Sequence, residues 1–201
     1  AEILVENQEY SKAAEIYYEI CLISDDVELA KRATQVSGYA RNYDLMLKSS
    51  ERWLVLAENK ISAMHVRISI FIALKQSDLA AKETLSIIKL SKDKDKFALV
   101  YDTLKVFDDK TIKKIFDQVY KEYKNEYLAN FYYVQILLNN EAYEEAITII
   151  QNSYKFKEFS KKESRWGIFL ADAYYEIGET DLSVKVLKDY LNYSPKDIYL
   201  N

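Results

Sequence analysis

A short phrase recurs along the chain at an almost constant interval, and this regularity limits the possible folds more than any other feature. The phrase places a polar turn before a marker residue, usually a small residue three positions later, and then an apolar run, as in NQEYSKAAEIYY and NNEAYEEAITII. The markers are Tyr10, Tyr43, Asp78, Thr111, Tyr143 and Thr180. By subtraction, successive markers are 33, 35, 33, 32 and 37 residues apart. A steady period of this length indicates stacked structural repeats.

Each repeat divides into two helical segments. Apolar residues recur at helical spacing in 27–40 and again in 43–57. The later pairs are 61–75 with 78–91, 94–107 with 111–124, 127–140 with 143–155, and 162–177 with 180–193. Helices of this length with short connections pack as antiparallel hairpins. Only three glycines and one proline are present, too few for many β-turns, so we expect an all-α protein.

The last repeat, ESRWGIFLADAYYEIGETDLSVKVLKDYLNYSPKD, places small, aromatic and proline residues in a known pattern. The matching residues are Leu170, Ala171, Tyr174, Gly178, Ser183, Leu187 and Pro195. On these residues the chain resembles the tetratricopeptide repeat (TPR) superfamily over essentially its whole length. The segment LAKRATQVSGYARNYDLMLKSSERWLVL is also similar to exported TPR proteins of Gram-negative bacteria. The resemblance implies a right-handed α-α superhelix of about five to five and a half helical hairpins.

Two departures from the TPR motif stand out. The tryptophan of the first helix is absent throughout, and Gly167 takes its place in the last repeat with Trp166 beside it. Lys114 occupies a position where a small residue is expected, because the two helices of a hairpin cross closely there. The polar, Lys-rich stretch at 155–164 is interpreted as a longer loop.

We expect a single domain over 1–201, shortened at its N-terminus, because the chain begins inside a helical pattern without a cap. The expected repeats are approximately 1–26 (partial), 27–60, 61–93, 94–126, 127–160 and 161–196. No apolar run approaches the roughly 20 residues of a membrane-spanning helix. The compartment is left open between a bacterial cytoplasm and, if an export signal was removed, the periplasm or envelope.

The sequence offers little chemistry for catalysis, so we expect no enzyme, no cofactor and no metal site. His65 is the only histidine, which excludes a three-histidine zinc site, and packing is the simpler role for it. Cys21, the only cysteine, has apolar neighbours typical of an inert buried thiol. Three glycines cannot build a phosphate-binding loop. A net charge of −4 argues against nucleic acid, despite eighteen tyrosines, most of which suit hairpin packing.

The TPR resemblance implies a function in the groove lined by the first helix of each pair. The candidate ligand-binding residues are Lys31, Gln35, Tyr39, Arg67, Lys96, Phe131, Gln135 and Asp172. Such a mixed lining suits an extended peptide or a partner helix. The first hypothesis is therefore a non-catalytic scaffold for an unidentified protein or peptide partner. Two alternatives stay open: the partner binds the convex face or an end, or the chain self-assembles as a structural component of a larger complex.

Overall fold

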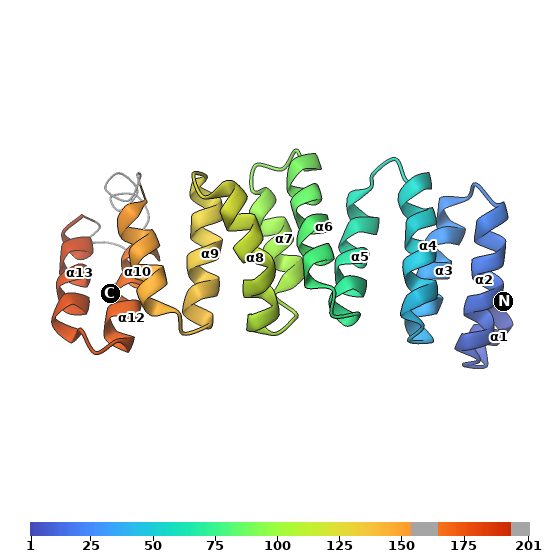
Figure 1. The fold of residues 1–201 in the computed structure, drawn as a ribbon, viewed down its shortest axis with the longest axis horizontal. Helices are drawn as coiled ribbons and strands as arrows, with labels where there is room; N and C mark the ends of the chain where they lie inside the picture. Colours follow the sequence, from blue (N-terminus) through green and yellow to red (C-terminus); the bar gives the residue numbers. More distant parts are fainter. Residues whose placement is uncertain (154–164, 194–201) are drawn as a thin grey trace. The chain divides into compact units, whose positions relative to one another are not determined.

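The computed structural model describes residues 1–153 and 165–193, which contain twelve α-helices and no β-strand (Figure 1). The loop predicted at 155–164 and the motif proline Pro195 lie outside the described residues. The all-α prediction is confirmed. The chain divides into two compact units, Ala1–Lys96 and Phe97–Asn201, which are described separately below. A single domain over the whole length remains a prediction.

The first unit is built from three consecutive helical hairpins. Its helices are α1 (Glu2–Glu6), α2 (Tyr10–Ile23), α3 (Val27–Tyr39), α4 (Tyr43–Leu56), α5 (Ile61–Ala73) and α6 (Ser77–Leu90). Each helix packs against the next one in the chain, and α2 also contacts α4. The first helix of each pair is called the A helix and the second the B helix, so that α1, α3 and α5 are the A helices here.

Small side chains set the spacing between helices in this unit. Ala13 on α2, Ala30 and Ala33 on α3, and Ser49 and Ser50 on α4 are all 0% exposed. A methyl or hydroxymethyl side chain lets two helix backbones approach closely, whereas a larger one would leave a gap or force the helices apart. Ala13 and Ala81, the small residues of the recurrent phrase in this unit, are both fully buried among the packed helices.

The N-terminal helix α1 is held to its neighbours by one carboxylate. Glu2 accepts hydrogen bonds from Arg32 on α3, from Nε at 2.9 Å and from Nη2 at 2.8 Å, and a further one from the Tyr17 hydroxyl on α2. These two partners, Arg32 foremost, lower the pKa of Glu2 from 4.5 to about 2. The charged carboxylate thus joins three consecutive helices.

Five of the hairpin turns share one backbone motif. Each has a residue with positive φ two positions before its B helix: Gln8, Arg41, Lys75, Glu141 and Gly178. At the second turn the Arg41 N–H donates to the Gly38 carbonyl and the Asn42 N–H to the Ser37 carbonyl, both at 3.0 Å. The same pair of bonds closes the other four turns. This is the Schellman motif, which satisfies the last carbonyls of the A helix and reverses the chain.

The second unit also consists of paired helices. These are α7 (Lys96–Leu104), α8 (Asp109–Tyr123), α9 (Tyr127–Asn139), α10 (Tyr143–Asn152), α12 (Arg165–Glu176) and α13 (Thr180–Tyr193). Contacts join α8 to α9, α9 to α10, α10 to α12 and α12 to α13, and α9 also contacts α12. The A helices of this unit are α7, α9 and α12.

The hairpin of α7 and α8 packs by a different device. Tyr101 and Phe116 meet edge to face with ring centroids 6.2 Å apart, and Phe97 and Tyr123 do so at 5.5 Å. Aromatic rings thus occupy the space between these two helices, whereas small side chains bring the helices of the first unit close together. Lys114 is exposed. The turn of this hairpin lacks a positive φ, and Asp108 caps α8 by accepting from the Thr111 N–H at 3.0 Å.

The final hairpin depends on a glycine. A Cβ atom at Gly167 on α12 would lie only 2.4 Å from Cγ of Tyr190 on α13. The Tyr190 ring therefore packs directly on the α12 backbone, and Tyr190 is 5% exposed. Trp166 beside it is 2% exposed and donates from Nε1 to the Tyr127 hydroxyl on α9 at 2.9 Å. Gly167 and Trp166 thus bring α12 into close contact with α13 and with α9.

Candidate functional site

In the first unit, three of the predicted groove residues form a stripe along α3. Lys31, Gln35 and Tyr39 follow one another at four-residue intervals, which places them on one helix face. Lys31 Nζ lies 3.4 Å from a Glu28 carboxylate oxygen, and Gln35 is exposed. Tyr39 is 56% exposed, and its ring centroid lies 5.6 Å from that of Tyr10 on α2. The stripe thus offers a cation, a carboxamide and a phenol to solvent.

The Arg67 side chain makes contacts within the first unit and is largely shielded from solvent. Its Nε donates to Glu83 on α6 at 2.7 Å, and its Nη1 lies 3.8 Å from a Glu51 carboxylate oxygen on α4. Its guanidinium also sits 5.2 Å from the centre of the Phe71 ring. The side chains of Arg67 and Glu83 are only 12% and 14% exposed. Arg67 therefore joins three helices of the first unit, and little of it can reach a ligand.

In the second unit, aromatic side chains cluster on the A helices. We call this surface the aromatic face and define it as Tyr101 on α7, Phe131 and Tyr132 on α9, and Arg165 and Phe169 on α12. The ring centroids of Tyr101 and Tyr132 are 5.2 Å apart, and those of Phe131 and Phe169 are 5.4 Å apart. The Arg165 guanidinium lies 4.6 Å from the centre of the Phe131 ring. Phe131 is 5% exposed, Arg165 is exposed, and the other three are half-buried.

The remaining predicted residues differ in their exposure. Gln135 lies one turn after Phe131 on α9 and is half-buried, whereas Asp172 on α12 is exposed. Partial desolvation and the nearby charge of Glu176 raise the pKa of Asp172 above its ordinary value. Lys96 is the first residue of α7 and is half-buried. Gln135 and Asp172 thus add polar groups to the two helices that carry most of the aromatic face.

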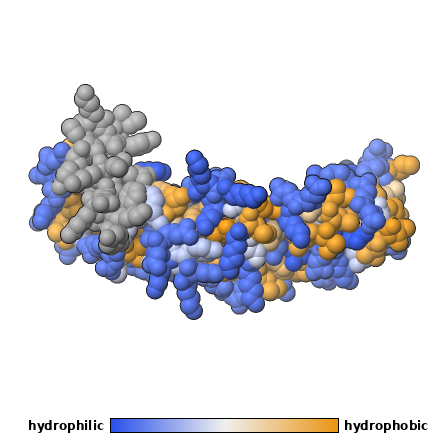
Figure 2. All heavy atoms as spheres, turned by 90° about the horizontal axis from the view of Figure 1, so that it is seen from above, coloured by the Kyte–Doolittle hydropathy of each residue, from blue (hydrophilic) through white to orange (hydrophobic). Residues whose placement is uncertain are grey.

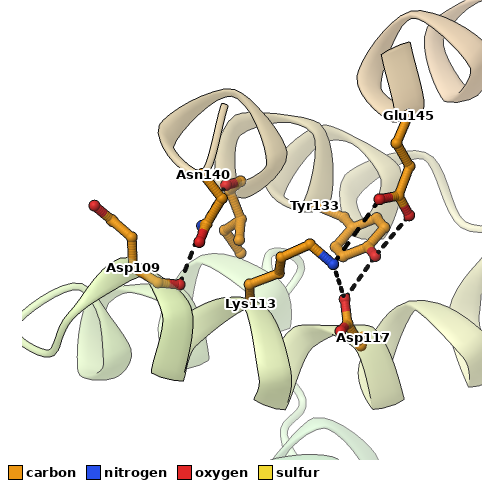
Figure 3. Close-up of polar contacts among 7 residues, drawn as sticks. Asp109, Lys113, Asp117, Tyr133, Asn140 and Glu145 are labelled. Carbon is orange, nitrogen blue, oxygen red and sulfur yellow. Dashed lines mark hydrogen bonds and ion pairs between the residues drawn. The ribbon is translucent and has the colours of Figure 1, made fainter. Parts of the chain in front are cut away.

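A polar cluster links α8, α9 and α10 (Figure 3). The buried Tyr133 hydroxyl lies 2.7 Å from Asp117 Oδ1 and 3.2 Å from Glu145 Oε1, so its single proton is donated to one carboxylate at a time. Lys113 Nζ lies 3.0 Å from Asp117 and 3.9 Å from Glu145. Burial and the two carboxylates raise the pKa of Tyr133 far above its ordinary value, so the phenol stays neutral. The cluster holds three helices together, with one cation, Lys113, between the two carboxylates of Asp117 and Glu145.

The two side chains most suited to catalysis are both withdrawn from solvent. Cys21 is 0% exposed, and burial raises the pKa of its thiol, so the nucleophilic thiolate is disfavoured. His65 is half-buried, and desolvation lowers the pKa of its imidazole. Within 1–153 and 165–193, no three His, Cys, Asp or Glu side chains are grouped so as to hold a metal ion. In the same ranges, no helix combines the length and the apolar character required to cross a membrane.

Comparison with known proteins shows which solved structures the fold is similar to. Neither a protein-family model nor a curated protein matches the chain. Among solved structures it is similar to YrrB, described as a TPR protein with an unusual peptide-binding site, at 12% identity and a TM-score of 0.51 over 95% of each chain. It is also similar to the MamA protein, at 11% identity and a TM-score of 0.47 over 85% of this chain and 92% of that one. Residues 41 to the end of MamA from Desulfovibrio magneticus RS-1 match at 13% identity and a TM-score of 0.39. This match covers 89% of this chain and 81% of that one. The similarity to YrrB shows that the chain has a TPR-like fold, and this confirms the fold that the sequence resemblance implied.

Sequence reasoning missed how the aromatic face is assembled. Phe131 was expected to line an open groove, but Tyr132, Phe169 and Arg165 from two helices cover its ring. The large number of tyrosines indicated aromatic packing. Which rings meet depends on the contact between α9 and α12, and composition does not reveal that contact. The surface that a ligand would touch is therefore the rim around Phe131.

Proposed function

We propose that the chain is a non-catalytic protein-interaction scaffold that binds an extended peptide or a partner helix on the aromatic face. The observation that carries this proposal is the exposed Arg165 guanidinium beside the half-exposed rings of Tyr132 and Phe169. Tyrosine, phenylalanine and arginine are enriched where proteins bind one another, because they bury a large area at a low cost in side-chain entropy. The fold adds support, since TPR-like repeats stack into surfaces suited to such partners.

The polar residues beside the aromatic face define the chemistry of the partner. Asp172 is an exposed acid one turn from Phe169, and Glu176 follows it by another turn. A partner segment with an apolar or aromatic side chain followed by a Lys or Arg would complement both features. Gln135 can donate and accept hydrogen bonds with a peptide backbone. YrrB, the TPR protein described as having a peptide-binding site, supports an assignment of the same class.

The proposal is tested by selecting peptides from a random displayed library on the purified chain. We expect enriched sequences that combine an apolar residue with a nearby cation. Asp172→Lys should weaken the best peptide by roughly fivefold, the upper value for one exposed ion pair. Asp189→Lys is the matched control, because Asp189 is exposed on the B helix α13. Equal weakening by the two variants, or selection of peptides without a cation, would contradict this site.

A second candidate, self-assembly, is favoured by apolar side chains on the first unit. Ile16, Ile20 and Ile23 follow one face of α2 and are 38%, 37% and 89% exposed. Figure 2 shows apolar surface at the end of the unit that holds the N-terminus. Sedimentation velocity over a hundredfold range of concentration tests this candidate. A mass that rises with concentration, and that falls back in Ile20→Lys, would support it, and a constant monomer would refute it.

A further inference from the structure

The helix α8 and its C-cap carry five lysines on one side. They fall within an arc of about 100° when each residue is advanced by about 100° around the helix axis. With a rise of about 1.5 Å per residue, the five lysines extend over about 20 Å along that axis. We call this surface the basic stripe and define it as Lys110, Lys113, Lys114, Lys121 and Lys124. The opposite side of α8 packs into the unit through the buried residues Ile112, Ile115, Phe116 and Val119.

Most of the charge on the basic stripe is not neutralised within the fold. Lys113 is half-buried, and its Nζ lies 3.0 Å from the Asp117 carboxylate. The other four lysines are exposed, and no ion pair joins them to the part of the chain that the structure describes. Asp117 is the only acidic residue within the arc, so five lysines and one aspartate leave a surplus of four positive charges. This surplus is local, because the whole chain has a net charge of −4.

The arrangement of these lysines is unfavourable for the helix itself. On α3, Lys31 follows a carboxylate by three positions, and its Nζ lies 3.4 Å from Glu28. Along the basic stripe, by contrast, Lys110 and Lys114 are four positions apart, and the last two lysines are three apart. Like charges at these spacings repel one another and destabilise a helix. Helix stability therefore does not explain the basic stripe.

The surface beside the basic stripe is acidic where α10 begins (Figure 3). Glu145 Oε2 on α10 lies 3.9 Å from Lys113 Nζ, and Asn140, shortly before α10, donates to the Asp109 carbonyl on α8 at 3.1 Å. The exposed acids at this end of α10 are Glu141, Glu144 and Glu145. Their carboxylates repel an anionic surface wider than one helix, such as a lipid bilayer or a nucleic-acid duplex. The stripe is therefore suited to a narrow anionic partner.

We propose that the basic stripe binds an acidic segment of a partner protein. Carboxylates of the segment pair with the four exposed lysines, whose aliphatic stems add apolar contact. In an extended segment, alternate side chains are about 6.6 Å apart, close to the distance of about 6 Å between Lys110 and Lys114 along the helix axis. About seven residues with acids at alternate positions therefore span the stripe.

This second surface is separate from the aromatic face. The aromatic face belongs to the A helices of the second unit, whereas the basic stripe belongs to the B helix α8. The chemistry of the two partners also differs, because Asp172 favours a cation beside the aromatic face and the stripe favours carboxylates. The inference therefore does not depend on peptide binding at the aromatic face.

Fluorescence anisotropy with labelled deca-glutamate as the probe tests the proposal. We expect saturable binding at about 50 mM NaCl, and none of the matched uncharged peptide deca-glutamine. Affinity should fall roughly tenfold by about 300 mM NaCl, because exposed ion pairs are screened by salt. No saturable binding of deca-glutamate at low salt would overturn the proposal. Tighter binding of a ten-nucleotide single-stranded DNA, or of phosphatidylserine vesicles, would overturn the assignment to an acidic protein segment.

Charge-reversed variants locate the binding surface. Lys114→Glu combined with Lys121→Glu should weaken deca-glutamate roughly tenfold, because two exposed ion pairs are replaced by repulsion. Lys185→Glu combined with Lys188→Glu is the matched control, because both lysines are exposed on the B helix α13 and the change in net charge is the same. We expect the control to bind within about twofold of the parent. Equal weakening by the two double variants would show that binding follows net charge alone and would overturn the proposal.

A third variant separates the basic stripe from the aromatic face. Phe169→Ala changes the aromatic face without changing the net charge, so deca-glutamate should bind this variant as tightly as the parent. Weakening by Phe169→Ala as large as that caused by the α8 double variant would place the probe on the aromatic face, and the proposal would fail.

Discussion

Replacing Gly167 by alanine should destabilise the second unit through a single steric clash. The added Cβ would lie 2.4 Å from Cγ and 2.6 Å from Cδ1 and Cδ2 of Tyr190. Ordinary van der Waals contact begins near 3.4 Å, so the ring must retreat by about 1 Å. Tyr190 is 5% exposed and has little room to move, so α12 and α13 must separate.

The net effect is the difference between two terms. Overpacking of this severity costs about 3 kcal/mol, at the upper end of the usual range. Alanine favours a helix over glycine by about 1 kcal/mol, which offsets part of the cost. The free energy of unfolding should therefore fall by about 2 kcal/mol. With an m-value of about 2 kcal/mol/M, the urea midpoint falls by about 1 M.

Tryptophan fluorescence during urea unfolding measures this change locally. In a Trp53→Phe background, Trp166 is the remaining tryptophan, and it is 2% exposed beside Gly167. Gly38→Ala on α3 is the matched control, because its Cβ would approach only Met46 Cε, the end of a flexible side chain, at 3.3 Å. We expect no loss of stability in the control. A Gly167→Ala protein as stable as the parent would refute the packing described for α12 and α13.

Three further predictions concern stability. Lys75 and Gly178 both have positive φ in matching turns, a conformation that glycine adopts most easily. Lys75→Gly should therefore raise the free energy of unfolding by about 1 kcal/mol, and Gly178→Ala should lower it by a similar amount. Thermal and urea unfolding measure both changes. Arg67→Met should lower the free energy of unfolding by about 3 kcal/mol, because it leaves the largely buried Glu83 without its partner. In a double-mutant cycle, adding Glu83→Leu should recover most of this loss. The lowered pKa of Glu2 means that its contribution to α1 docking is present above about pH 4.5 and is lost as the pH falls toward 2; the NMR signals of α1 should show this dependence in the parent and not in Glu2→Gln.

Much of the fold could be predicted because helical repeats follow local rules. Tyr10, Tyr43, Tyr143 and Thr180 are the first residues of α2, α4, α10 and α13. A polar turn followed by apolar residues at helical spacing is a signal contained in one stretch of sequence, so it needs no knowledge of distant contacts. Lys114 also marked correctly the hairpin that packs differently from the others.

The turn geometry gave weaker signals. Glycine is the usual sign of a left-handed turn residue, and only Gly178 provides it. At Gln8, Arg41, Lys75 and Glu141 a non-glycine residue adopts positive φ, because the packing of the two helices on each side offsets the strain. Residue type alone could not reveal these four turns.

The candidate sites depended on contacts between repeats, which periodicity does not encode. Arg67 looked like a groove residue, but Glu83, sixteen positions later, binds it in the folded unit. Phe131 and Asn130 are neighbours in sequence, and yet one helical step turns the side chain by about 100°. Phe131 consequently contributes to the aromatic face, whereas Asn130 lines a cavity walled by α8, α9 and α10.

Binding of a peptide or helix on the A helices of the second unit can be tested directly. The most direct measurement is an NMR titration of labelled protein with the best peptide selected from the library, followed residue by residue. Binding at the aromatic face predicts the largest shifts at Tyr132, Arg165, Phe169 and Asp172, with α13 unchanged. Shifts confined to α13 or to the exposed apolar face of α2, or a library that yields no binding peptide, would contradict it.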